Sequence, residues 1–248
     1  MKNLLHIPGY ILAFFRAIFA FVTIAIYVLV YIITIPIFGN THERGFKLRR
    51  KWIALGMKIF GIRLINKGVP LDQPALYVSN HLSFTDPIAT CKYIDAFVIA
   101  KAEVGNIPLL SKGAEMTGVI YVDRGSKSSR SNTRKALVDT LASGKNVLVY
   151  PEGTVSENSI ILPYKAGAFR EAFANDIPIV PIAIAYGAEK DIWNNTGLVG
   201  HFFKQLSYWR TEITQEIGTP ITGVDGDDIA LKANAWTKDI ISQYRKLN

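Results

Sequence analysis

The chain has 248 residues, 49% of them hydrophobic and 19% charged, which fits one catalytic domain with a short appendage and excludes an intrinsically disordered chain. A single cysteine and four scattered histidines exclude a disulfide scaffold and leave no zinc-binding pattern. The 28 basic against 20 acidic side chains, a net charge of +8, indicate an anionic partner: a nucleic acid, a membrane surface or a phosphorylated substrate.

The first predicted element is an apolar helix near the N-terminus. Residues Ala17–Ile35 contain no charge, and as a helix this run would be about 28 Å long, close to the thickness of a hydrocarbon core. A buried core helix and a signal peptide are the alternatives, although no A-x-A cleavage site follows the run. We expect residues 1–40 to be a membrane-anchoring helix or helical hairpin that spans the bilayer or lies in one leaflet.

A basic segment follows at residues 41–67. Between Arg44 and Lys67 lie eight basic residues and no acidic one, together with Phe46 and Trp52. This pattern favours a segment on the cytoplasmic face of an anionic membrane. The alternative is an ordinary amphipathic helix packed on the domain, and the two interpretations are compatible. Lipid explains the charge better than nucleic acid, since no nucleic-acid-binding motif is present in the sequence.

Short β-branched runs then alternate with helical segments through a predicted domain at residues 41–248. This alternation, with apolar runs such as V-L-V-Y that are typical of strands covered on both faces, predicts an α/β fold with a mixed, mostly parallel sheet. The predicted strands are Ile62–Asn66, Ala75–Ser79, Ala96–Ala100, Val119–Val122, Asn146–Tyr150, Ile179–Tyr186 and Trp209–Ile217. The predicted helices are Pro87–Tyr93, Ser128–Ala142, Lys165–Ala174 and Asp227–Arg245.

Three polar motifs follow predicted strands. In N-H-L-S-F-T-D, Asp86 could fold back onto a ring nitrogen of His81, as a general base requires, or it could simply cap the next helix. In G-V-I-Y-V-D-R, Arg124 could bind a phosphate or form a surface ion pair. In Y-P-E-G-T, Glu152 could hold a hydroxyl or position Arg124, with Gly153 allowing close backbone approach, or the motif could be a solvated turn.

These motifs, in this order and with I-P-I-V-P-I-A-I after them, closely resemble the glycerolipid acyltransferase family over residues 46–222, in particular the bacterial 1-acylglycerol-3-phosphate acyltransferases. The two prolines of the last motif suggest an edge strand or a bulge. The resemblance implies the fold of that family and an O-acyltransferase in phospholipid synthesis, with no metal or prosthetic group.

The resemblance also assigns roles to residues. His81 would deprotonate the hydroxyl of a lysolipid acceptor, and Asp86 would orient His81. The donor would be acyl-CoA or acyl-carrier protein, with no acyl-enzyme intermediate. Arg124 would bind the acceptor's phosphate, and Lys101 and Lys165 would contribute further positive charge. The residues that would shape or charge the acceptor site are Glu152, Gly153, Thr154, Lys101 and Lys165.

One residue departs from the family pattern. Where the family usually has Arg after E-G-T, this chain has Val155. A charge-assisted contact to phosphate typically contributes about 1.5–3 kcal/mol, so its loss weakens selection for a phosphomonoester. The acceptor is therefore expected to be 1-acyl-glycerol-3-phosphate, giving phosphatidic acid, or else another lysophospholipid or a lyso-ornithine lipid. A thioesterase and a non-catalytic lipid-binding protein are more remote alternatives.

Overall fold

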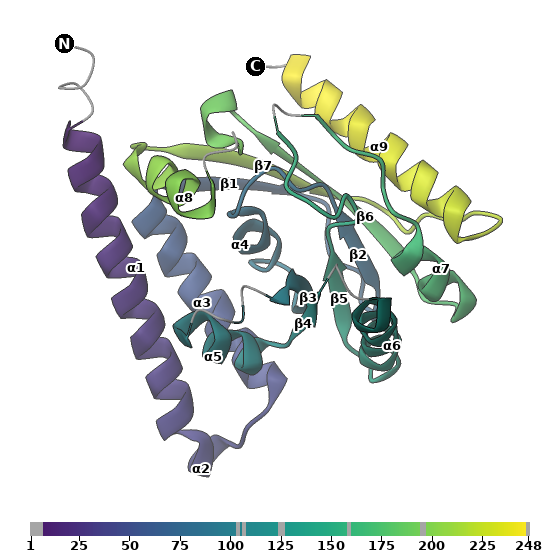
Figure 1. The fold of residues 1–248 in the computed structure, drawn as a ribbon, viewed down its shortest axis with the longest axis horizontal. Helices are drawn as coiled ribbons and strands as arrows, with labels where there is room; N and C mark the ends of the chain where they lie inside the picture. Colours follow the sequence, from purple (N-terminus) through teal and green to yellow (C-terminus); the bar gives the residue numbers. More distant parts are fainter. Residues whose placement is uncertain are drawn as a thin grey trace.

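The computed structural model describes residues 7–102, 105, 108–123, 127–157, 160–193 and 197–246. In this part of the chain one seven-stranded sheet has the order β1-β7-β6-β2-β5-β3-β4 (Figure 1). All neighbouring strands are parallel except β6 and β7, which are antiparallel. The strands are β1 (Ile62–Lys67), β2 (Leu76–Ser79), β3 (Ala96–Lys101), β4 (Val119–Val122), β5 (Asn146–Val149), β6 (Ile179–Tyr186) and β7 (Thr211–Ile217). The predicted α/β fold with a mixed, mostly parallel sheet is confirmed.

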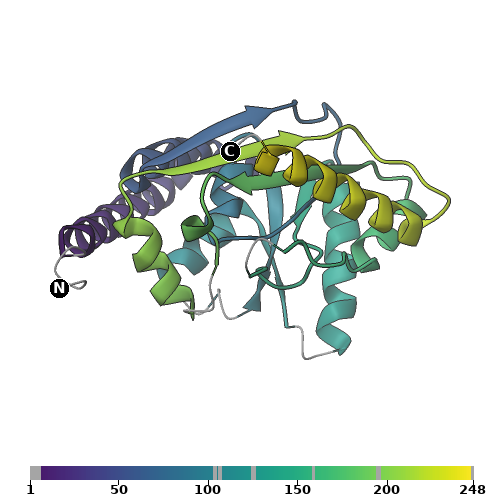
Figure 2. The ribbon, with the colours of Figure 1, turned by 90° about the horizontal axis from the view of Figure 1, so that it is seen from above.

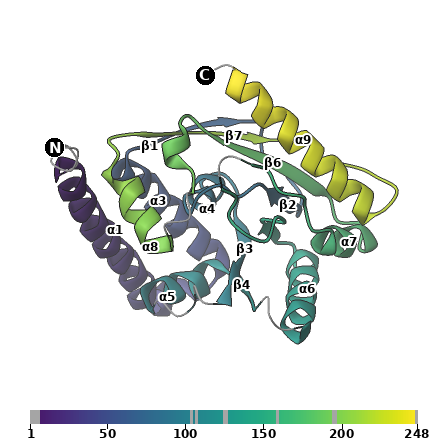
Figure 3. The same cartoon turned by 45° about the horizontal axis from the view of Figure 1, so that its top comes forward.

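Helices cover both faces of the sheet, and alternation along β2 shows the two sides. Leu76 and Val78 pack into a cluster with α6 (Lys127–Ala142), α7 (Gly167–Ala174) and α9 (Gly226–Lys246). Tyr77 packs on the opposite face with α3 (His42–Phe60) and α4 (Asp86–Thr90). Figure 3 shows α6, α7 and α9 on one side and α3 and α4 on the other. Burial of both faces explains why the central strands are continuously apolar.

The N-terminal helix α1 (Ile7–Ile33) lies at the edge of the molecule, far from α9 (Figures 1 and 2). It packs against α3, α5 (Pro108–Thr117) and α8 (Gly197–Ser207), and the short α2 (Ile35–Phe38) turns the chain back toward α3. Among the described helices α1 alone is long and apolar enough to cross a membrane: 26 residues from Pro8 have a mean hydropathy of 2.3, and 22% of the apolar window is buried. Its outer side chains are large, apolar and exposed.

A charged residue inside α1 is turned toward the domain. The guanidinium of Arg16 donates hydrogen bonds to the carbonyl oxygens of Leu206 at 3.0 Å and Tyr208 at 2.5 Å, at the C-terminal end of α8. Carbonyl groups at a helix C-terminus carry partial negative charge, so this contact stabilises the cation and fixes α1 to α8. The outer face of α1 is consequently left apolar.

The first part of the basic segment forms α3, which is an amphipathic helix packed on the sheet, and its last two basic residues, Arg63 and Lys67, lie in strand β1. Phe46 is buried and Trp52 is half-buried, so neither aromatic ring lies on the outer surface. Arg49 donates to the carbonyl oxygen of Ala96 at 2.9 Å, and Arg50 forms an ion pair with Asp95 at 3.2 Å. Part of the positive charge therefore has a structural use. Lysines at positions 47, 51 and 58 remain exposed on the outer side of α3.

Some expectations were wrong in detail. β6 is an interior strand, so the prolines do not mark an edge. Pro181 has no N–H to donate, but the β6–β7 ladder begins only at the next residue, Ile182. The carbonyl oxygen of Pro181 accepts from Gly218 N at 2.9 Å, just past the end of β7, so the proline interrupts no bond within the ladder. The sequence prediction also lacked α5 and α8, and it began the apolar helix later than α1 begins.

Candidate active site

The two central motifs meet at one edge of the sheet. His81 follows the end of β2, and Glu152 follows the end of β5, its parallel neighbour. The carboxyl ends of parallel neighbouring strands share an edge, where ligands of open α/β sheets bind. Asn80 fixes the loop after β2, because its amide group donates to Ile184 O at 2.9 Å and accepts from Ile184 N at 2.8 Å. The motif loop is thus bonded to the next strand of the sheet, β6.

His81 and Asp86 form a close pair. Asp86 Oδ2 lies 2.7 Å from His81 Nδ1 and also accepts from the backbone N–H groups of Leu82 at 2.6 Å and Ser83 at 2.9 Å. The Asp86 side chain is fully buried, whereas 19% of the His81 side chain is exposed. A carboxylate on Nδ1 selects the tautomer with a proton there, which leaves Nε2 as the basic nitrogen.

Asp86 is not a helix cap, which was the alternative for this residue. It is the first residue of α4, and Thr85 occupies the cap position. The carboxylate turns back into the preceding turn instead of accepting from α4. The five-residue spacing is therefore explained by a tight loop that wraps around the carboxylate.

Glu152 points inward and joins the two motif loops. Its carboxylate accepts from the backbone N–H of His81 at 2.9 Å, from Leu162 N at 3.1 Å and from the hydroxyl of Ser156. Only 3% of the residue is exposed, and burial raises the pKa of its carboxyl group, which the hydrogen bonds oppose. Glu152 thus holds the His81 backbone in place and does not present its carboxylate to the surface.

The Tyr150 ring stacks on the imidazole of His81, with centroids 4.3 Å apart and planes inclined by 23°. Tyr150 is buried, and burial raises the pKa of its phenol well above the usual value. The ring therefore stays neutral and restricts the imidazole from one side. Sequence reasoning assigned no role to Tyr150.

The loop after Glu152 places a lysine beside the site. Gly153 has a φ of 76°, and the Lys165 side chain lies against its α-carbon, where a Cβ atom would contact it. Thr154 and Lys165 are exposed, whereas Val155 is half-buried. A positive charge therefore lies against Gly153, two residues before Val155, the position at which the family usually has an arginine.

Other expected site residues lie farther along the sheet or outside the description. Lys101 is exposed at the end of β3. Arg124 falls outside the described residues, so its role stays a prediction. Within the described ranges, no group of three or more His, Cys, Asp or Glu side chains is arranged to hold a metal ion.

Sequence reasoning missed the surroundings of Asp86. The hydroxyl of Tyr186, at the end of β6, donates to Asp86 Oδ1 at 2.5 Å. The hydroxyl of Thr85 lies 2.6 Å from the Tyr186 hydroxyl. His201 of α8 is fully buried, with Nε2 2.9 Å from Ser83 Oγ, and burial lowers its pKa to about 4. Tyr186 and His201 are about one hundred residues from the motif, and no spacing rule connects them to it.

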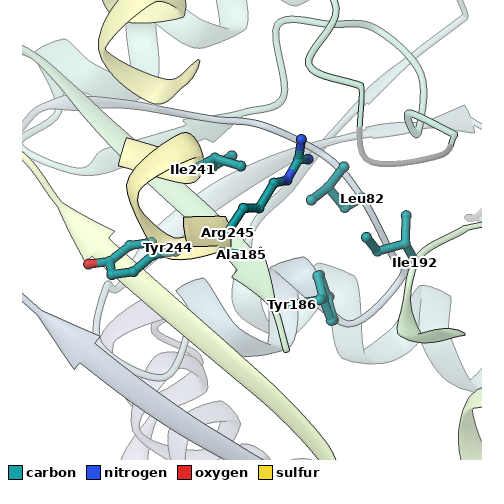
Figure 4. A pocket seen from close by; sticks show the side chains of 7 residues that line it. All are labelled: Leu82, Ala185, Tyr186, Ile192, Ile241, Tyr244 and Arg245. Carbon is teal, nitrogen blue, oxygen red and sulfur yellow. The ribbon is translucent and has the colours of Figure 1, made fainter. Parts of the chain in front are cut away.

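A cavity of about 30 Å³ lies next to this group. Figure 4 shows its lining, which includes Leu82 and Tyr186, both bonded to Asp86, and Ile241 and Tyr244 of α9. This volume admits water-sized molecules and is too small for an acyl chain.

Comparison with known proteins agrees with the motifs. The family model described as Acyltransferase matches residues 61–185, half of the chain, including both central motifs. The chain belongs to this acyltransferase family. The match begins just before β1 and ends within β6, so it covers the strands β1 to β5, most of β6 and both motif loops, and it leaves out β7.

Individual relatives are distant. The acyltransferase is 27% identical over 195 residues to the lyso-ornithine lipid O-acyltransferase of Pseudomonas aeruginosa, covering 75% of each chain. It is 28% identical over 144 residues to the 1-acyl-sn-glycerol-3-phosphate acyltransferase of Neisseria gonorrhoeae, covering 55% of this chain and 56% of that one. The crystal structure of the 1-acyl-sn-glycerophosphate acyltransferase from Thermotoga maritima matches with a TM-score of 0.77 over 99% of this chain and 98% of that chain, at 17% identity. This last likeness shows the fold, including the long N-terminal helix.

Proposed function

We propose that the protein is a membrane-associated O-acyltransferase that moves an acyl group from a thioester donor, acyl-CoA or acyl-carrier protein, to the free hydroxyl of a lysolipid. The observation that carries this proposal is the His81–Asp86 pair, in which the carboxylate is buried and the imidazole reaches the surface. By their names, the Pseudomonas relative acts on a lyso-ornithine lipid and the Neisseria relative on 1-acyl-sn-glycerol-3-phosphate, which supports a lysolipid acceptor here.

In the proposed reaction, Nε2 of His81 takes the proton of the acceptor hydroxyl as its oxygen attacks the thioester carbonyl carbon. Asp86 stabilises the imidazolium that forms. The carbon–sulfur bond then breaks, and the imidazolium returns the proton to the leaving thiolate. The products are the ester and the free thiol, and His81 is neutral again. Buried Ser83 is bonded to His201, which supports direct transfer without an acyl-serine.

We propose 1-acyl-glycerol-3-phosphate as the acceptor, with Arg124 and Lys165 contributing positive charge. Lys165 lies against Gly153, beside the loop that lacks the family's arginine. The hydroxyl of Ser156, next to Val155, donates to Glu152 and is therefore not available to the acceptor. A lyso-ornithine lipid is the second candidate, favoured by Val155 and by the Pseudomonas relative.

We also propose that residues 1–40 anchor the protein and that 41–248 form the catalytic domain, on the cytoplasmic face. The exposed apolar face of α1 supports membrane attachment, and the exposed lysines of α3 are compatible with an anionic surface. An acceptor could keep its acyl chain in the lipid while its head group reaches His81.

An acceptor panel tests the proposal. Purified protein in detergent is given radiolabelled acyl-CoA or acyl-carrier protein with lysophosphatidic acid, other lysophospholipids or lyso-ornithine lipid. We expect acceptor-dependent ester formation, fastest with lysophosphatidic acid. Faster transfer to lyso-ornithine lipid would show that the second candidate is the acceptor. Release of free fatty acid without any acceptor requirement would identify a thioesterase and refute the proposal.

A further inference from the structure

Four side chains form a line of hydrogen bonds that ends on Asp86. From α8 inward, His201 Nε2 lies 2.9 Å from Ser83 Oγ, which lies 3.2 Å from Thr85 Oγ1. Thr85 Oγ1 lies 2.6 Å from the Tyr186 hydroxyl, which lies 2.5 Å from Asp86 Oδ1. Ser83, Thr85 and His201 are completely buried. The line therefore reaches the face of the carboxylate opposite His81, away from bulk water.

The number of protons fixes the directions of the two bonds nearest the carboxylate. A carboxylate can only accept, so the single proton of the Tyr186 hydroxyl points to Asp86. Thr85 must then donate to Tyr186, because that oxygen has no second proton to give. Thr85 is also the donor in its longer contact with Ser83, at 3.2 Å, so its one proton is shared between Ser83 and the nearer oxygen of Tyr186. The hydroxyls of Thr85 and Tyr186 thus polarise one another toward Asp86.

The surroundings of His201 indicate its tautomer. Nε2 is the ring nitrogen that faces Ser83 Oγ, at 2.9 Å. The other ring nitrogen, Nδ1, has no hydrogen-bond partner among the described residues, as suits a bare lone pair better than an N–H group. Trp193 and Phe84 pack around the ring, with centroids 4.9 and 5.7 Å away, and keep it from water.

We propose that Tyr186 is a positioning residue whose hydroxyl, oriented by Thr85, fixes Asp86 and thereby the imidazole of His81; we call the Thr85–Tyr186 pair the relay. This inference rests on the proposed function. With Oδ1 held by Tyr186, Oδ2 is left to face His81 Nδ1 and the two backbone N–H groups. Without that donor the carboxylate loses one of its fixed partners, and the ring that it orients is less well aligned for proton transfer.

Kinetics of hydroxyl-deleting variants test the relay. We expect Tyr186→Phe to lower kcat about tenfold, with KM for donor and acceptor changed less than about twofold, because no substrate contact is removed. Thr85→Val, which keeps the volume but removes the hydroxyl, lowers kcat about threefold, and Thr85→Ser keeps it. Because both act through one chain, the double variant is no slower than Tyr186→Phe alone.

The matched control is Tyr77→Phe. Tyr77 is a fully buried strand tyrosine on the same face of the sheet, beside Val180 at the far end of β6 from Tyr186, and its hydroxyl accepts from Leu71 N at 3.0 Å. It loses a buried hydrogen bond without touching the relay, so kcat stays within about twofold of the wild type. An unchanged kcat in Tyr186→Phe, an effect confined to KM, or rates that multiply in the double variant would each overturn the proposal.

A second readout needs no substrate. Nitrogen NMR of protein labelled with ¹⁵N-histidine reports which ring nitrogen carries the proton. We expect a proton on Nδ1 of His81 in the wild type and in Tyr77→Phe, and a shifted Nδ1 resonance in Tyr186→Phe. An unchanged Nδ1 resonance in Tyr186→Phe would overturn the proposal. Since this result does not depend on turnover, failure of the relay and failure of the proposed function are distinguishable.

Discussion

Replacement of Glu152 by Gln tests whether this residue acts as an internal brace. The carboxylate accepts from two backbone N–H groups and one hydroxyl, on both of its oxygens. A glutamine retains one acceptor oxygen and turns an NH₂ group toward the remaining donors, so at least one backbone N–H loses its partner. An unsatisfied buried donor costs about 1–3 kcal/mol.

For a chain of this size, 1 kcal/mol lowers Tm by about 2–4 °C, so we expect Glu152→Gln to melt about 2–12 °C below the wild type. Because Glu152 holds the backbone of His81, we also expect a lower kcat with little change in acceptor KM. Thermal denaturation and steady-state acylation measure the two effects. The matched control is Glu157→Gln, the same change at an exposed position of the same loop.

The result that would refute this reasoning is a Glu152→Gln protein as stable as the wild type, with only the acceptor KM raised. That pattern would mean that the carboxylate contacts substrate. A second check uses pH: a carboxyl group whose pKa is raised by folding stabilises the protein below its unfolded pKa of about 4.5 and destabilises it progressively as pH rises above that value. Glu152→Gln removes this slope.

Three further predictions follow from the site and from α1. Burial lowers the pKa of His201 from 6.5 to about 4, so its contribution to stability is present above pH 6.5 and is lost as pH falls toward 4; His201→Gln should show a flatter denaturation profile in that window, and an unchanged profile would contradict the burial argument. Gly153→Ala, at a φ of 76° and against Lys165, should lower stability by about 1–2 kcal/mol in urea titrations and slow acylation, whereas a neutral result would contradict the strain. In anionic vesicles, a spin label at Val22→Cys on α1 should be shielded from aqueous quenchers, whereas a label at exposed Leu231→Cys should not be. Labelling is selective because the single native cysteine, Cys91, is buried. Equal accessibility of the two labels would refute lipid contact of α1.

The sheet could be predicted from the sequence because its signals are local. The apolar run at 179–186 identifies β6 fully, since a strand buried on both faces leaves a continuous pattern. α8 could not be predicted in the same way: it has His and Gln on its buried face and exposed Leu198 and Val199. Its position depends on contacts with α1 and with the active-site loop, which lie far away in the chain.

The candidate site was predictable to the extent that its residues share a motif. His81 and Asp86 were singled out together and lie together. Glu152 was also singled out, but sequence cannot show toward which side a carboxylate points, and the structure places it inward. Tyr186 and His201 approach Asp86 only because β6 and α8 fold beside the motif loop. The charge of α3 was assigned to lipid, whereas Arg49 and Arg50 have internal partners.

The central claim is that His81 accepts the proton of a lysolipid hydroxyl. Its most direct test is initial-rate acyl transfer to lysophosphatidic acid by the wild type and by His81→Ala, with His42→Ala as the matched control on the outer helix α3. The account predicts acceptor-dependent ester formation that falls at least about a hundredfold in His81→Ala, the range of general-base contributions, while His42→Ala stays active. Full activity of His81→Ala in a protein that folds as the wild type would contradict it.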